Sequence, residues 1–266
     1  MRCTRACISA GLKGGFALPF PGPRAEAEPL ALLSFVDAGD MKFGDPASAA
    51  NRERFLLDAG FDPSNLRSLE LKHSRTVVFP LSGDDPAVLA QAAGGADGLV
   101  LRDPRLAASV TVADCLPIWL LDRGSGAFGI LHSGWRGTGI LEAALRGMAE
   151  RFGSRPSTIA VVLGPAIGPC CYSVSEERAL GFAAEFGEES VSRRGGSHFL
   201  DLRQANISMA ERAGIGDLLS VDACTSCDAR LGSFRRQGAA SFTRMLAVCG
   251  RGSKNTEVPT SQPQAV

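Results

Sequence analysis

The sequence has no excess of charge of either sign, because 28 Lys and Arg residues match 28 Asp and Glu residues in a chain of 266. This balance excludes a general electrostatic attraction to nucleic acid, so any anion site must be local. No apolar run approaches the roughly 18 residues of a membrane helix. Residues 1–20 also lack the continuous apolar stretch of a signal peptide. We therefore expect a cytoplasmic protein that binds neither nucleic acid nor a membrane, and we predict no particular oligomeric state.

A disulfide framework is also absent, although the chain has eight cysteines. They are scattered over a long chain, two are adjacent at Cys170 and Cys171, and a composition that is 45% hydrophobic can form a core without cross-links. Cys224 and Cys227 form a Cys-x-x-Cys pair, but no second pair follows at zinc-ribbon spacing. We therefore expect reduced cysteines and a structural role for this pair.

Short apolar runs alternate with helical patterns along most of the chain. Between residues 138 and 152, for example, the apolar side chains recur at helical spacing and the charged ones lie on the other face. This alternation predicts a single α/β domain over residues 29–249, with a mixed β-sheet covered by helices on its faces. A short helix is expected at residues 85–93. Residues 1–28 are expected to be loosely ordered, and residues 250–266 to be a disordered tail.

Residues 109–137 carry the most informative pattern, since two apolar runs joined by a glycine-rich turn are flanked by reactive side chains. Cys115 precedes the first of these runs and His132 ends the second. Because two adjacent strands joined by a short turn return the chain to its starting level, we expect this thiol and this imidazole to meet. His73 ends another alternating segment, whose pattern places it on the inward face.

Together, His73, Cys115 and His132 offer two imidazoles and one thiolate on separate segments. Three protein ligands leave one position of a tetrahedral zinc ion open, which is typical of catalytic rather than structural zinc. Two alternatives use the same residues. Cys115 could be a nucleophile with His132 as its base, in a hydrolase or amidase, or the site could hold one copper ion with Met41 or Met209 as axial ligand.

Six motifs carry a resemblance to a known family: ANRERF, ADGLV, TVADCLPIWLLD, HSGWRG, GPAIGPCCYSV and SFRRQG. Over residues 30–249 the chain resembles the YfiH-like family, first described as laccase-domain polyphenol oxidases and now regarded as zinc-containing purine nucleoside phosphorylases. The resemblance implies that His73, Cys115 and His132 are the zinc ligands. With three histidines, the chain cannot supply the ligands of the several coppers of a laccase.

The activity that this resemblance implies is the phosphorolysis of adenosine, and also of inosine, guanosine or methylthioadenosine, to a purine base and ribose 1-phosphate. Adenosine deamination is an implied side activity. Such a reaction needs an anion site for phosphate and an acid near the departing base. We predict Arg52, Arg136 and Arg236 for the anion site and Asp114 for the acid or base.

The sequence departs from the family pattern at three places near these motifs. Leu71 stands where the family has Gln, Ser173 where it has Glu, and Gly232 where it has Tyr. The three zinc ligands are unaffected by these changes. We therefore expect the departures to alter contacts with the nucleoside rather than with the metal.

Overall fold

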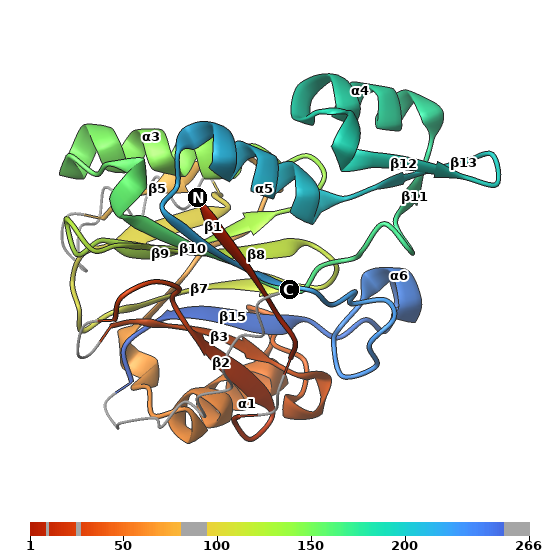
Figure 1. Cartoon of the computed structure of the whole chain (residues 1–266). Coiled ribbons are helices and arrows are strands. Elements are labelled where there is room, and N and C mark those ends of the chain that lie inside the picture. The colour runs from red at the N-terminus through yellow and green to blue at the C-terminus, as the bar shows by residue number, and fades with distance from the viewer. Residues whose placement is uncertain (9–10, 25–27, 81–94, 253–266) are drawn as a thin grey trace.

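The computed structural model describes residues 1–8, 11–24, 28–80 and 95–252. Within them, two β-sheets pack face to face between helices (Figure 1). The mixed α/β prediction is confirmed, and the second sheet, where a helix was expected, covers one face of the central sheet. The helix predicted at residues 85–93 and nearly all of the predicted tail lie outside the described residues.

A seven-stranded mixed sheet forms the centre of the molecule, in the order β1-β14-β10-β8-β9-β6-β5. In chain order its strands are β1 (Arg2–Ala6), β5 (Val77–Val78), β6 (Gly98–Leu101), β8 (Leu116–Asp122), β9 (Phe128–Ser133), β10 (Ile159–Leu163) and β14 (Asp217–Val221). The pairing of β14 with both β1 and β10 is parallel, whereas β8 is antiparallel to both β9 and β10.

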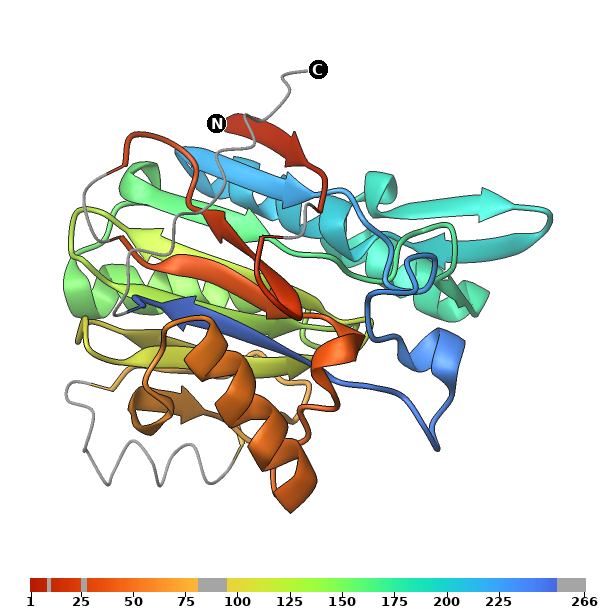
Figure 2. The same cartoon turned by 90° about the horizontal axis from the view of Figure 1, so that it is seen from below.

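The second sheet has five strands in the order β2-β3-β15-β7-β4. They are β2 (Gly15–Pro19), β3 (Leu30–Ser34), β4 (Leu66–Ser68), β7 (Ala107–Val112) and β15 (Met245–Gly250). Figure 2 shows this sheet from below, with helix α1 (Pro46–Asp58) lying across its outer face. The helix begins at Pro46, where Asp45 caps it by accepting a 2.8 Å hydrogen bond from the backbone N–H of Ser48.

Strand β8 contributes side chains to the two hydrophobic cores that lie on opposite faces of the central sheet. Successive side chains of a strand point to opposite faces, so Ile118 and Leu120 pack toward helices α3 (Ile140–Phe152) and α5 (Leu202–Ala213). Trp119 and Leu121 instead pack into the core between the two sheets. Because both faces are covered, every residue of β8 is buried, and the run is apolar up to its last residue, Asp122, instead of alternating.

A smaller unit stands at one side of the central sheet (Figure 1). It consists of a three-stranded sheet and helix α4 (Glu176–Phe186). The strands, in the order β11-β13-β12, are β11 (Ser173–Val174), β12 (Val191–Arg194) and β13 (Ser197–Leu200). Short helix α6 (Phe234–Gln237) lies before β15, and four 3-10 helices complete the described elements: Val36–Ala38, Pro63–Asn65, Pro156–Thr158 and Glu188–Ser190.

The expectation of a loosely ordered N-terminal segment is wrong for two stretches of residues 1–28. Residues 2–6 form β1 at the edge of the seven-stranded sheet, and residues 15–19 form β2 at the edge of the other. Both strands obtain their order by pairing with β14 and β3, which follow them in the chain. Edge strands are stabilised by such tertiary pairing, so the local sequence gave little sign of them.

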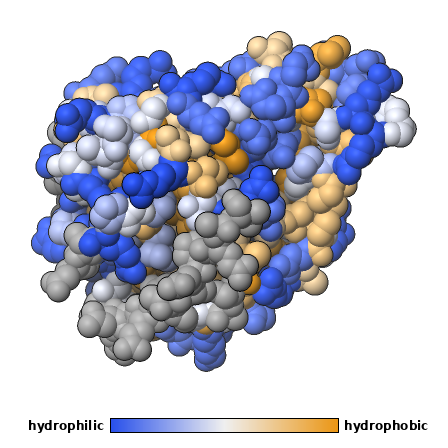
Figure 3. All heavy atoms as spheres, viewed as in Figure 1, coloured by the Kyte–Doolittle hydropathy of each residue, from blue (hydrophilic) through white to orange (hydrophobic). Residues whose placement is uncertain are grey.

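No helix in the described part of the chain is long and apolar enough to span a membrane. Hydrophilic residues predominate on the face seen in Figure 1, and hydrophobic residues form smaller groups among them (Figure 3).

Candidate metal centre and active site

Cys115 and His132 meet at one end of the β8–β9 pair, as the sequence predicts. In this antiparallel pair, Leu116 lies opposite Ser133 and Pro117 lies opposite His132. Cys115 immediately precedes β8 and His132 is the penultimate residue of β9, so the register brings them to the same level. The meeting therefore follows from a tight turn and a hairpin register within one short segment.

His73 reaches the same point from a loop, and its predicted position on the inward face of a strand is wrong. Strand β4 ends at Ser68, and His73 itself is exposed, with a left-handed φ of 57°. Asp114 has a φ of 84°, and these two are the only non-glycine residues in the described ranges with positive φ. Such backbone conformations are uncommon and tend to cluster at functional sites.

The three predicted ligands fit a metal ion. One ligand atom of each of His73, Cys115 and His132 lies within 4.8 Å of the others. The two imidazole rings are edge to face, with centroids 4.9 Å apart. A Cβ added to Gly134 would lie 2.7 Å from the sulfur of Cys115, so only glycine leaves this space to the thiolate. Two nitrogens, one sulfur and an open fourth position are a donor set that zinc accepts.

Asp97 holds two of the candidate metal ligands in place, and it is a site residue that was not among those predicted from the sequence. It is fully buried, and one of its oxygens lies 2.8 Å from His132 Nδ1. The same oxygen accepts from the backbone N–H of His73 at 2.9 Å, and the other accepts from Ser74 N–H at 2.7 Å. Asp97 thereby leaves His132 Nε2 for the metal and positions the loop that carries His73. Asp97 belongs to the ADGLV motif, and this membership was the sign in the sequence that could have identified it.

Without a metal, Cys115 and His132 form a charged pair. Burial raises the pKa of the Cys115 thiol, but the neighbouring His132 and His73 outweigh it and lower that pKa to about 6. Burial lowers the pKa of His132, whereas the Cys115 thiolate and Asp97 raise it to about 10. The thiolate is thus the stable form of Cys115 at neutral pH, ready to bind a metal or to act as a nucleophile.

The metal centre opens into a cavity of about 750 Å³. This volume lies within the range of small-molecule sites. Besides the three ligands, the cavity is lined by arginines and aromatic residues, namely Arg136, Arg178, Arg235, Arg244, Trp135, Tyr172, Phe234 and Phe242. The lining therefore offers both positive charge and flat apolar surfaces.

Two of these arginines form no ion pair with a carboxylate among the described residues. Arg178 and Arg136 lie over the ring of Trp135, with their guanidinium carbons 3.7 Å and 5.3 Å from its centroid. Arg235 instead hydrogen-bonds to the main chain at Cys171 and Ser173.

Arg52 and Arg236 do not line the cavity, so their positions do not support the predicted anion-binding role. Arg52 donates to the backbone carbonyls of Met41 and Lys42. Arg236 donates to the backbone carbonyls of three residues: Thr225, Asp228 and Leu231. Both guanidinium groups therefore hold loops in place. Arg136 is the one predicted arginine that lines the cavity.

Asp114 lines the cavity, but its carboxylate is engaged. Thr225 Oγ1 and the backbone N–H of Arg235 each donate to one of its oxygens, both at 2.6 Å. The carboxylate therefore joins two loops. Met41 and Met209, the candidates for an axial copper ligand, both pack in hydrophobic cores and neither lines the cavity.

Comparison with known proteins places this architecture among related chains. Residues 37–251 match the family described as multi-copper polyphenol oxidoreductase laccase. A purine nucleoside phosphorylase of Deinococcus radiodurans is 36% identical over 229 residues, which cover 84% of each chain. The purine nucleoside phosphorylase YlmD of Geobacillus stearothermophilus is 33% identical over 177 residues, or 64% of this chain and 65% of YlmD. The crystal structure of YlmD superposes with a TM-score of 0.76 at 29% identity, covering 85% of this chain and 92% of that one.

Proposed function

Since the chain belongs to the family described as multi-copper polyphenol oxidoreductase laccase, we propose that it shares the activity for which its relatives are named and is a purine nucleoside phosphorylase. The reaction would convert adenosine, and also inosine, guanosine or methylthioadenosine, with inorganic phosphate into a purine base and ribose 1-phosphate. The observation that carries this proposal is a pair of arginines beside the candidate metal centre, Arg136 and Arg178, which line the cavity and form no ion pair within the described residues.

Phosphate binding is assigned to these two guanidinium groups. Both border the cavity and neither forms an ion pair in the described residues, so an anion would meet two positive charges without displacing a carboxylate. Each charge-assisted contact contributes about 1.5–3 kcal/mol. Two such contacts hold the attacking anion and stabilise the charge that develops as the glycosidic bond breaks.

The purine is assigned to the aromatic part of the lining. Phe234 and Phe242 pack edge to face with ring centroids 5.1 Å apart, and Phe234 is 47% exposed. An exposed ring at the cavity offers a face on which a flat base can stack. Tyr172 lines the same cavity, and burial together with the Cys115 charge raises its pKa to about 12. Its hydroxyl therefore stays protonated and can donate a hydrogen bond to the departing base.

Zinc is the metal proposed for His73, Cys115 and His132. A zinc ion there would supply a Lewis acid that polarises a substrate atom and lowers the pKa of a bound water, which is the chemistry that adenosine deamination needs. Around it, Asp97 keeps His132 in one tautomer. We assign to Asp114 a positioning role instead of proton transfer, because both its oxygens already accept hydrogen bonds.

Product analysis of adenosine incubations with and without phosphate tests the proposal. We expect adenine and ribose 1-phosphate to form at a rate that rises with phosphate and saturates. Inosine formed at a rate indifferent to phosphate would report the deaminase side activity. Equal release of adenine in both incubations, or inosine as the sole product, would refute phosphorolysis.

The Arg136→Ala variant locates the phosphate. Loss of one charge-assisted contact of about 1.5–3 kcal/mol should raise the KM for phosphate by about 10- to 100-fold. The matched control is Arg146→Ala, on the exposed side of α3 and outside the cavity lining. A phosphate KM unchanged in Arg136→Ala would contradict this assignment.

A Cys115 nucleophile with His132 as its base is the second candidate, because their charged pair resembles an activated thiolate. The two candidates differ in their need for metal. Hydrolysis of an amide or ester by the metal-free protein, lost after alkylation of Cys115, would support the nucleophile. A metal-free protein that regains nucleoside cleavage only when zinc is returned would support the phosphorylase.

A further inference from the structure

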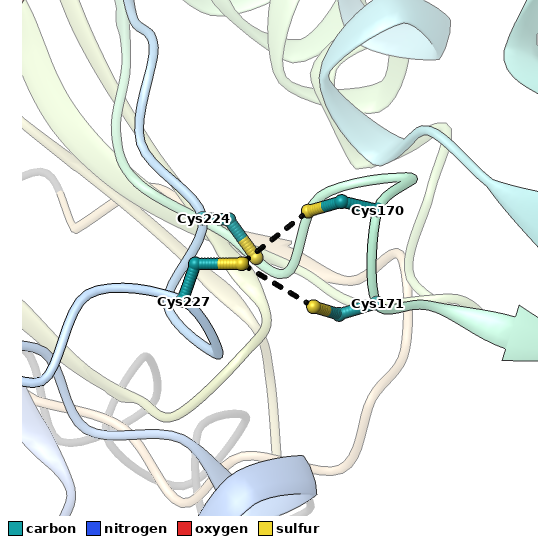
Figure 4. Close-up of side chains that lie close together, drawn as sticks. All are labelled: Cys170, Cys171, Cys224 and Cys227. Carbon is teal, nitrogen blue, oxygen red and sulfur yellow. Dashed lines mark hydrogen bonds between the residues drawn. The ribbon is translucent and has the colours of Figure 1, made fainter.

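Four cysteines that the proposed reaction does not use converge beside the cavity (Figure 4). Cys170 and Cys171 follow β10, and Cys224 and Cys227 follow β14. All four sulfur atoms lie within 4.8 Å of one another. The sulfur of Cys227 lies 3.4 Å from that of Cys171 and 3.7 Å from that of Cys170. The two cysteine pairs therefore form one four-sulfur cluster.

Topology explains why the pairs meet although more than 50 residues separate them. Strands β10 and β14 are parallel neighbours, so their following loops leave the same edge of the sheet. The loops continue to pair beyond the strands, because Ala166 forms a parallel bridge with Cys224 and its carbonyl accepts from Thr225 N–H at 3.1 Å. Cys224 and Cys227 thus lie beside a second cysteine pair, which is not at zinc-ribbon spacing in the sequence and could not be found by that spacing.

We propose that Cys170, Cys171, Cys224 and Cys227 bind a second zinc ion, in a closed structural site. Zinc binds thiolates at about 2.3 Å in a tetrahedron, which places the sulfurs about 3.8 Å apart. Two of the sulfur–sulfur distances in the cluster, 3.7 Å and 3.4 Å, lie close to this value, and no pair is more than 4.8 Å apart. Four thiolates complete the coordination shell, so this site has no open position for substrate.

The geometry favours a metal over disulfides. A disulfide requires sulfurs about 2.05 Å apart, and all four cysteines are free in the structure. Cys170 and Cys171 are adjacent, so their Cα atoms are about 3.8 Å apart, closer than the roughly 4.4 Å minimum that disulfides usually show. In addition, the backbone N–H of Gly168 points at the sulfur of Cys224 at 3.2 Å. Such an outer-shell hydrogen bond supports a metal-bound thiolate.

The position of the cluster indicates what the metal would do. Ile167 and Tyr172 line the cavity on either side of the first cysteine pair. Thr225, which directly follows Cys224, donates to Asp114 on the cavity wall at 2.6 Å. A zinc ion joining the two loops would therefore fix this wall and connect it to the segment that carries Cys115.

Metal content of the full-length protein tests the inference independently of the proposed reaction. The protein is purified under reducing conditions without added zinc, and metals are counted by mass spectrometry. We expect two zinc ions per chain, one in the Cys115→Ala variant and one in the Cys224→Ser, Cys227→Ser double variant. The control is Cys3→Ser, an exposed cysteine on β1 outside both sites, which should retain two.

X-ray absorption of the Cys115→Ala protein gives a second measurement that leaves the four-cysteine cluster intact. We expect four sulfur neighbours at about 2.3 Å around zinc. The proposal would be overturned if this variant held no metal, if it held iron in place of zinc, or if the zinc had nitrogen neighbours. A disulfide within the cluster, seen as fewer than four titratable thiols, would also overturn it. If the unmodified protein holds two zinc ions but does not cleave nucleosides, the result would count against the proposed function alone.

Discussion

Replacing Asp97 by Asn should loosen the candidate metal centre without changing any ligand. The Asp97 carboxylate has no exposed surface and faces the ring of His132. It also accepts from the backbone N–H groups of Lys72, His73 and Ser74 and from the Ser74 hydroxyl, at 2.7–3.2 Å. One carboxylate thereby holds one ligand by its side chain and another by its backbone.

The size of the effect follows from the number of donors around Asp97. An amide retains one oxygen acceptor and turns its NH₂ toward N–H donors, so at least one buried donor loses its partner. Removing one partner of a buried charged pair costs about 3–5 kcal/mol of folding stability. Outer-shell changes of this kind lower metal affinity by about 10- to 100-fold, equivalent to about 1.4–2.7 kcal/mol.

The measurement is zinc affinity by competition with a chromophoric chelator, on protein shown to be folded by circular dichroism. The matched control is Asp103→Asn, just beyond the other end of β6, where the side chain accepts hydrogen bonds from Arg105 and lies outside the metal centre. A folded Asp97→Asn protein that binds zinc at this site as tightly as the wild type would refute the positioning role of Asp97.

Three further predictions rest on other parts of the structure. Gly134→Ala should lower zinc affinity at least about 10-fold in the same chelator assay, because the new methyl group would lie 2.7 Å from the Cys115 sulfur; unchanged affinity would contradict it. Arg178→Ala should raise the KM for phosphate by about 10- to 100-fold in steady-state assays, whereas kcat at saturating phosphate changes less; a change in kcat alone would count against phosphate binding there. Asp122→Ala should cost roughly 3 kcal/mol of unfolding free energy near neutral pH, measured by urea titration. Burial raises the pKa of Asp122, but hydrogen bonds from Ser125, Ser154, Thr158 and Gly124 outweigh it and lower that pKa. The contribution of Asp122 is therefore present above its ordinary pKa of 3.8 and lost as pH falls below it, so the difference between variant and wild type should shrink in acid; a difference that grows in acid would contradict this.

Local pattern was sufficient where a feature depends on one continuous segment. The Cys115 and His132 pair follows from two apolar runs and a turn, and α3 ends at Phe152 as its periodicity predicts. The loop at His73 could not be predicted in this way. Its shape depends on the buried carboxylate of Asp97, and alternation of apolar residues carries no sign of such a partner.

Features that depend on contacts between distant segments were not visible in the sequence. Arg178 lies on a helix whose charged residues resemble an ordinary solvated face, and only the placement of α4 brings it over Trp135. For Arg236 the local sequence was misleading. Its neighbouring arginine and glycine suggest a phosphate-binding site, but its guanidinium group donates to backbone carbonyls. In the same way, Cys-x-x-Cys spacing shows half of a four-sulfur cluster, because a different loop supplies the other half.

The parallel pairing of β1 with β14 has a consequence for synthesis on the ribosome. The partner of β1 begins about 210 residues later in the chain. At roughly 5–20 residues per second, β1 must wait about 10–40 s for the strand on which it docks. Its arginines, Arg2 and Arg5, are charges of the kind that keep an unpaired edge from joining other chains. Strand β1 is therefore made long before the sheet edge on which it docks, and we expect its two positive charges to limit pairing with other chains during the delay.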